Sequence, residues 1–269
     1  MMRKNRATIV IPLLVQRDDW LRTCVLSALS QTVPCEVIVV IAPRTSRSNL
    51  SVLEELKEQH SNLLVRMQGP NQGFAGAINT GLRSASTERV GLLLSDDWLD
   101  ESAVEQSLKF DTDIVSTGSI VYDSDGTRKI DDRPLTLDQY EEKPSLEEKA
   151  SYLDHFFLFR KNKVMEVGGV DESIGRTGAD DYDLIWTLLE RGATVSIVGR
   201  SLYNYRDHGE ERLSLRKRED QVRDLEKILD KHGVSAHDRK AIVEKHSIWY
   251  GRPIQVVLKS LKSNLSLLH

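Results

Sequence analysis

The sequence has few of the residues that mark secreted, metal-clustered or membrane-spanning proteins. Only two of its 269 residues are cysteines, Cys24 and Cys35, and their spacing matches no metal-ligand motif. Two thiols in a chain of this length are typical of a reducing compartment, where they pack in the core. No stretch approaches the roughly 20 consecutive apolar residues that a membrane-spanning helix needs. We therefore expect a cytoplasmic protein.

The sequence also lacks a strong excess of one charge. The net charge is −4, with 37 Lys and Arg against 41 Asp and Glu, so the basic footprint of a nucleic-acid-binding protein is missing and we expect no nucleic acid partner. The apolar run 7–15 is interrupted by Pro12 and followed at once by charged residues, which predicts a strand rather than a signal peptide. Apolar residues make up 39% and charged residues 29%, which is the balance of a folded globular chain.

The first hundred residues alternate between strand-like and helix-like segments. Continuous aliphatic runs, typical of strands covered on both faces, occupy 8–11, 36–41, 63–67 and 90–94. Amphipathic spacing predicts one helix opening at Asp18 or Asp19 and a second opening at Ser48 or Asn49. Strands and helices that alternate in this way predict a doubly wound, mostly parallel α/β sheet with helices on both faces.

Two adjacent carboxylates, Asp96 and Asp97, follow the fourth of these strands. Open α/β sheets bind ligands at the carboxyl ends of their strands, and hard carboxylate oxygens suit Mg²⁺ or Mn²⁺. The alternative is that Asp97 or Asp100 only caps a helix beginning at Trp98. These residues alone leave both interpretations open.

A glycine-rich stretch, 69–81, precedes the fourth strand. Gly73 and its small neighbours let a backbone approach a ligand closely, and Asn71 and Asn79 offer amide donors and acceptors. A helix starting near Phe74 would aim its first N–H groups at an anion. The stretch matches no Walker or dinucleotide fingerprint, so a turn followed by a tightly packed helix is the equal alternative.

A second acidic group, Asp180, Asp181 and Asp183, opens a helix that ends near 191–192. An acidic first turn complements the helix dipole, which is one explanation, but three Asp in four residues exceed what one cap needs. His208 stands alone in a polar segment after a strand expected at 195–198. A single loop histidine is more often a surface residue than a ligand.

The rest of the chain is less informative. Strands are expected at 113–118 and 156–159, a helix at 161–167, and a loop at 131–134 within the polar stretch 119–146. The charged segment 218–231 predicts a solvated helix. The apolar tail 254–265 packs back on the domain in the default interpretation. Peripheral contact with the inner face of a membrane, or a homo-oligomer formed through the tail, are the alternatives.

In this order, the segments resemble the family-2 inverting glycosyltransferases with the GT-A fold. The resemblance implies a Rossmann-like α/β domain over 1–214, with a nucleotide-sugar half about 1–100 and an acceptor half about 101–214. A helical C-terminal appendage follows at 215–269. The matching segments are 11–12, 26–32, 36–40, 71–81, 94–99, 168–172, 180–184, 191–192 and 205–208.

The resemblance also implies roles for individual residues. Asp96 matches the final, metal-binding Asp of an Asp-x-Asp motif, His208 matches a histidine that completes the metal site in some members, and the cofactor is Mn²⁺ or Mg²⁺. Asp181 matches the catalytic base. The acceptor side includes Asp180 and Trp98. The residues implied to bind the donor are Pro12, Asn71, Gly73, Asn79, Asp96 and Asp97.

The implied reaction moves a sugar from a nucleotide-diphosphate sugar to a hydroxyl-bearing acceptor, as in cell-surface polysaccharide or glycoconjugate synthesis. The 71–81 segment looks most like a rhamnosyltransferase-like branch, which favours a UDP or dTDP donor. The sequence departs from the family at three places, with Leu94 at the first Asp of the motif, 41–44 after the second strand, and 13–15 after the first.

These departures motivate a non-catalytic sugar-nucleotide or glycan-binding protein on the same fold as the alternative. A nucleotidyltransferase ranks lower, because the segment 12–19 has a single Arg and no Gly.

Overall fold

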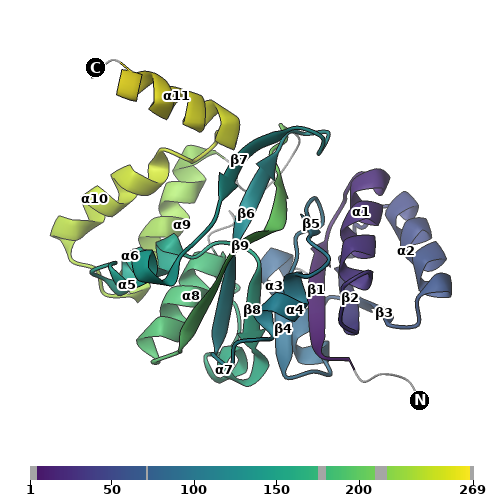
Figure 1. The fold of residues 1–269 in the computed structure, drawn as a ribbon. Coiled ribbons are helices and arrows are strands. Elements are labelled where there is room, and N and C mark those ends of the chain that lie inside the picture. Colours follow the sequence, from purple (N-terminus) through teal and green to yellow (C-terminus); the bar gives the residue numbers. More distant parts are fainter. Residues whose placement is uncertain (1–4, 71, 175–179, 210–216, 267–269) are drawn as a thin grey trace.

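The computed structural model describes residues 5–70, 72–174, 180–209 and 217–266, and their strands form one mixed sheet with helices on both faces (Figure 1). Within these residues the strand order is β3-β2-β1-β4-β8-β6-β9-β5, with β7 paired to β6. The strands are β1 Ala7–Leu13, β2 Cys35–Ile41, β3 Leu63–Met67, β4 Arg89–Leu92, β5 Trp98–Leu99, β6 Ile114–Tyr122, β7 Lys129–Arg133, β8 Phe157–Arg160 and β9 Val195–Arg206.

The amino-terminal half of the sheet is parallel, as the alternating pattern predicts. β1 pairs with β2 and β4, and β2 pairs with β3, all in parallel register. Every residue of β1 and β2 is buried, because helices cover both faces. α1 Asp18–Leu29 and α2 Arg47–Gln59 pack with Ile9 and Val37 on one face, while α3 Gly73–Ser84 packs with Val10 and Ile38 on the other.

The carboxy-terminal half of the sheet is mixed. β8 runs antiparallel to β4 and β6, while β9 runs parallel to β6 and antiparallel to β5. The α/β fold class is confirmed. The other helices of this half are α4 Ala103–Ser107, α5 Leu137–Glu141, α6 Leu146–Tyr152, α7 Lys161–Glu166 and α8 Asp180–Glu190.

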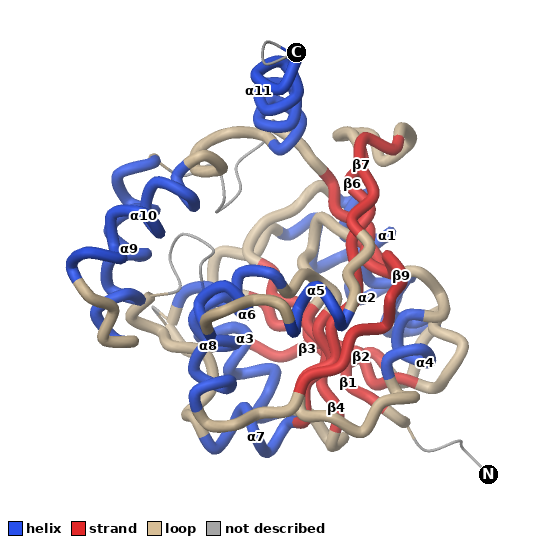
Figure 2. The backbone as a smooth tube through the Cα atoms, turned by 60° about the vertical axis from the view of Figure 1, so that its left-hand side comes forward, coloured by secondary structure: helices blue, strands red, loops and turns tan. Residues whose placement is uncertain are grey.

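Some expected strands were too short, and one expected loop is a strand. The segment 131–134, expected to be a loop, lies mostly in β7, which pairs antiparallel with β6. Polar edge strands carry no continuous apolar run, so the composition suggested a loop. β6 and β9 each extend several residues beyond their apolar portions, and the far end of β6 pairs with β7 on one side and β9 on the other (Figures 1 and 2).

Three helices follow in the C-terminal segment, α9 Arg218–Lys231, α10 Ala236–Ser247 and α11 Ile254–Ser266 (Figure 2). α10 was not expected. On α9, Leu225, Ile228 and Leu229 are fully buried in the same core cluster as α8. α9 therefore shares its core with α8. None of the described helices has the length and apolar character to cross a bilayer.

Candidate active site

Asp96 and His208 meet where β4 and β9 end. The chain turns after β4, with the amide of Asp97 donating to the carbonyl of Leu94 at 3.2 Å, and this turn presents the Asp96 side chain. His208 follows the end of β9 and its Nε2 lies 3.0 Å from Asp96 Oδ2. His208 is only 3% exposed, so the expectation of a surface histidine is wrong. A buried imidazole facing a carboxylate at a strand end fits a ligand site.

Asp97 points the other way, into the protein. Its Oδ2 accepts from the Tyr203 hydroxyl at 2.6 Å and its Oδ1 from the Arg206 amide at 2.7 Å. Burial and the neighbouring Asp96 raise the pKa of Asp97 well above its ordinary value. The carboxyl group ties the turn to β9, so its position indicates a structural clamp rather than the expected donor contact. Trp98 begins β5, so the alternative of a helix there is wrong.

Arg206 lies between two indole rings beside this turn. Its guanidinium carbon is 4.8 Å from the Trp20 ring centre and 4.9 Å from the Trp98 ring centre. Its Nε donates to the carbonyl of Asp96 at 2.9 Å, and the Trp20 ring lies 4.7 Å from the His208 ring. Stacked cation–π contacts hold the guanidinium in place, so Arg206 fixes the backbone that carries Asp96. Trp98, expected on the acceptor side, has this packing role.

The Asp96 and His208 pair fits a divalent cation. A carboxylate oxygen and an imidazole nitrogen that face each other at 3.0 Å are two suitable donors. The His208 Nδ1 is buried and has no hydrogen-bond partner among the described residues. The described part of the chain holds no group of three or more His, Cys, Asp or Glu side chains that would form a complete protein cage. Mg²⁺ and Mn²⁺ usually keep positions for substrate phosphates and water, so two protein ligands are compatible with either ion.

Asp181 lies at the start of α8 and pairs with His155. The Nε2 of His155 is 3.2 Å from Asp181 Oδ2. Burial alone would lower the pKa of His155, but the hydrogen bond to Asp181 and the charges of Asp181, Asp154 and Asp97 raise it to about 9. Near neutral pH the imidazole is therefore protonated. It holds the Asp181 carboxylate in one orientation while leaving 30% of that side chain exposed.

The other two carboxylates of the acidic group have separate partners. Burial and the charge of Asp181 raise the pKa of Asp180 to about 7. Asp183 pairs with two residues at the end of α9. Its carboxylate lies 2.7 Å from Lys231 Nζ and 3.1 Å from His232 Nε2. The three carboxylates thus have different settings. Asp181 is the base candidate, Asp180 is a buried acid, and Asp183 links α8 to α9, which explains why there are more Asp residues than a helix cap needs.

The remaining predicted donor residues have different settings. Gly73 begins α3 with φ +67°, a left-handed conformation that favours glycine, and it is exposed. Asn79 exchanges two hydrogen bonds of 2.8 Å with the backbone of Val170, which gives it a structural role between α3 and that segment. Pro12 is buried within β1, which continues to Leu13. Asn71 lies outside the described residues.

The departures from the family pattern also have local partners. The carbonyl of Leu94 accepts from Cys24 Sγ at 3.2 Å, and the amide of Ala42 donates to Thr45 Oγ1 at 3.0 Å. Leu14 and Val15 are 57% and 58% exposed at the exit of β1. The exit of β1 thus offers apolar surface at one of the places where the sequence departs from the family pattern.

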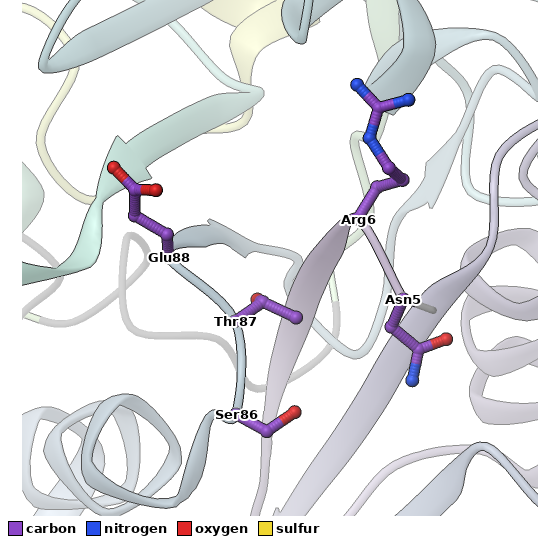
Figure 3. A pocket seen from close by; sticks show the side chains of 5 residues that line it. All are labelled: Asn5, Arg6, Ser86, Thr87 and Glu88. Carbon is purple, nitrogen blue, oxygen red and sulfur yellow. The ribbon is translucent and has the colours of Figure 1, made fainter. Parts of the chain in front are cut away.

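One cavity lies at the opposite ends of the strands, before β1 and β4 begin. It has a volume of about 440 Å³ and is lined by Asn5, Arg6, Ser86, Thr87 and Glu88 (Figure 3). These residues lead into β1 and β4, so the cavity is at the amino ends of parallel strands. Ligand sites of such sheets lie at the carboxyl ends, so we do not place the active site there.

Four side chains of the site were not singled out from the sequence, Trp20, His155, Tyr203 and Arg206. Tyr203 and Arg206 stand on β9, and their partners Asp96 and Asp97 precede them by more than a hundred positions. The only available signal was the run of polar and aromatic residues at 203–208, beyond the apolar part of that strand.

A model of glycosyl transferase family 2 matches residues 8–168, more than half of the chain. The chain is a member of glycosyl transferase family 2. The O-antigen biosynthesis protein RfbC of Myxococcus xanthus is 26% identical over 207 residues, which are 76% of this chain and 16% of that protein. The chondroitin synthase of Escherichia coli is 31% identical over 192 residues, which are 70% of this chain and 27% of that protein. This family member thus spans less than a third of either relative.

Solved structures share the fold. S. aureus TarS 1-349 in complex with UDP-GlcNAc matches with a TM-score of 0.65 at 16% identity, covering 86% of this chain and 67% of that one. The mannosyltransferase PcManGT from Pyrobaculum calidifontis, in complex with GDP-Man and Mn²⁺, matches with a TM-score of 0.65 at 17% identity. It covers 98% of this chain and 81% of that one. The family-2 chain thus has the fold of these glycosyltransferases.

Proposed function

We propose that this protein is a metal-dependent, inverting glycosyltransferase that moves a sugar from a nucleotide-diphosphate donor to a hydroxyl-bearing acceptor in surface polysaccharide synthesis. The observation that carries the proposal is the presence of two separate pairs, Asp96 with His208 and Asp181 with His155. One pair suits a cation beside a diphosphate, and the other presents a partly exposed carboxylate. Family membership and relatives named for O-antigen and chondroitin synthesis support the same reaction class.

In this reaction, Asp181 accepts the proton of the acceptor hydroxyl while that oxygen bonds to the anomeric carbon of the donor sugar. The bond from the anomeric carbon to the diphosphate breaks at the same time, and the nucleoside diphosphate leaves with the bonding electrons. A single displacement inverts the anomeric centre. Asp96 and His208 would hold a divalent cation, which would supply positive charge to stabilise the departing diphosphate.

The test is a panel of UDP-, dTDP- and GDP-sugars incubated with the protein, with and without Mn²⁺ or Mg²⁺, while nucleoside diphosphate release is measured. We expect release from one donor class only when metal is present, and loss of that release in Asp96→Ala. UDP- or dTDP-sugars are the favoured donors. If no donor is bound or hydrolysed with metal present, the apolar replacements near Leu14, Ala42 and Leu94 have removed the donor site. The alternative of a glycan-binding protein then leads.

A further inference from the structure

A second cavity, of about 450 Å³, opens beside Asp181. Its lining includes residues from the part of the chain that the family model matches and residues from the segment after α9. Its volume falls within the range of small-molecule sites. The side chains used below are Arg133, Asp181, Tyr182, Lys245, His246 and Trp249.

Aromatic and charged groups alternate around this cavity. Trp249, in the turn after α10, is 38% exposed, and the Arg133 guanidinium carbon lies 5.5 Å from its ring centre. Tyr182 follows Asp181 directly, and its ring lies 5.1 Å from the His246 ring. Flat rings cover the apolar face of a sugar, while the guanidinium, ammonium and carboxylate groups nearby bind its hydroxyls.

The wall contributed by α10 is attached to the rest of the site through one buried carboxylate. Glu147 on α6 is 7% exposed and accepts from the Tyr182 hydroxyl at 3.2 Å and from His246 Nε2 at 3.2 Å. The Nζ of Lys245 lies 3.7 Å from the same oxygen. Because Glu147 holds α8 and α10 together, the cavity is formed before any ligand enters, which lowers the entropic cost of binding.

We infer that this cavity is the acceptor site and that the acceptor is a carbohydrate whose terminal ring stacks on Trp249 with a hydroxyl directed at Asp181. The inference rests on the proposed function and adds the substrate class and the element that selects it. The segment 245–250 then determines which saccharide is used, although it lies outside the residues matched by the family model.

The test measures saccharide binding separately from donor chemistry. Trisaccharides labelled with a fluorophore at the reducing end, and ending in glucose, N-acetylgalactosamine, glucuronic acid or rhamnose, are titrated with the full chain in the absence of donor. We expect at least one to bind, about tenfold or more weaker binding in Trp249→Ala, and substantial recovery in Trp249→Phe. Ile248→Ala is the matched control, because Ile248 is the exposed neighbour and does not line the cavity.

Donor hydrolysis with water as acceptor is measured for the wild type and the control Ile248→Ala, and should be equal in both. The inference is overturned if Trp249→Ala and Ile248→Ala bind a saccharide equally well, or if none binds while the donor is hydrolysed. If saccharides bind through Trp249 but no donor is hydrolysed, the transferase proposal fails and the saccharide site stands. If neither binding nor hydrolysis occurs, both fail.

Discussion

The Nε2 of His155 lies 3.2 Å from Asp181 Oδ2, and the His155 ring packs 5.1 Å from the ring of Tyr203. Tyr203 in turn donates its hydroxyl to Asp97. The candidate base and the candidate metal ligand Asp96 are thus positioned by one connected set of buried side chains. A change on either side of the site has a physical route to the other.

Replacing the candidate base should stop transfer without weakening donor binding. Asp181→Asn keeps the shape of the side chain but accepts no proton, so we expect kcat to fall by about 10²–10⁴-fold. His155→Gln leaves Asp181 without its charged partner and should reduce kcat by a smaller factor. Initial rates and donor Kd, measured on the same preparations, check this. A variant Asp181→Asn that retains more than a tenth of the wild-type kcat would rule out the base role.

Removing one candidate metal ligand should change the metal requirement. In His208→Ala, only Asp96 is left from the pair, and the half-saturating concentration of Mn²⁺ should rise by more than about tenfold. EDTA should abolish donor hydrolysis in the wild type, and added Mn²⁺ should restore it. An unchanged Mn²⁺ titration curve in His208→Ala would show that this imidazole binds no cation.

The stability of the protein should fall as the pH rises from about 6.5 to about 9. His155 has a pKa of about 9 in the folded protein against about 6.5 in an unfolded chain, so the native state holds a proton that the unfolded state releases in this window. The loss should be on the order of 1–3 kcal/mol in the free energy of unfolding. Urea unfolding at several pH values measures it, and His155→Gln should flatten the curve.

Asp180 should act in the same direction at lower pH. Burial and Asp181 raise its pKa to about 7 against about 4 when unfolded, so its contribution to stability is lost as the pH rises between those values. Asp180→Asn should remove this part of the slope and leave the part due to His155. A stability curve that is identical in the wild type and Asp180→Asn below pH 7 would contradict the assignment.

Removing the hydrogen bond between Tyr203 and Asp97 should lower the stability of the protein. Tyr203→Phe removes the hydroxyl that donates at 2.6 Å to a carboxylate only 1% exposed, which leaves a buried oxygen unsatisfied. We expect a loss of about 1–3 kcal/mol in the free energy of unfolding. A double-mutant cycle with Asp97→Asn isolates the pair, because the two single effects should not add. Strict additivity would mean that the contact contributes nothing.

The helix α9 should behave as part of the hydrophobic core that contains α8. Leu225→Ala removes a fully buried side chain from the cluster shared with α8, so the free energy of unfolding should fall by about 2–5 kcal/mol. Glu226→Ala, the next and exposed residue of the same helix, should change it by less than about 0.5 kcal/mol. Equal effects from both variants would place α9 outside the core.

The parallel half of the fold was predictable because its strands are continuous aliphatic runs, which periodicity detects. β7 was not, since a polar edge strand acquires its order from pairing rather than from its own composition. The far end of β9 was not either, because its polar residues are ordered by pairing with β6 and β5. Asp96 became a candidate through its position after a predicted strand, and motif resemblance gave Asp96 and Asp181 their proposed roles. The orientation of Asp97 was not, because adjacent carboxylates in a sequence do not show which one turns inward.

The partners His155 and Arg206 depend on contacts between distant segments. Arg206 meets Asp96 only because β5 pairs antiparallel with β9, and that pairing leaves no trace in either segment alone. The same holds for Trp249, which reaches the cavity only through the way α10 packs on α6 and α8.

Asp207, next to His208, accepts from the first amides of α11, those of Ile254 at 3.0 Å and Gln255 at 2.9 Å. This carboxylate is fully buried, so the helix cannot shift along its axis without pulling on it. A load applied to α11, from a tether or a docked surface, is therefore transmitted to a candidate metal ligand across a single peptide unit. The C-terminal helix and the candidate metal site are therefore mechanically coupled.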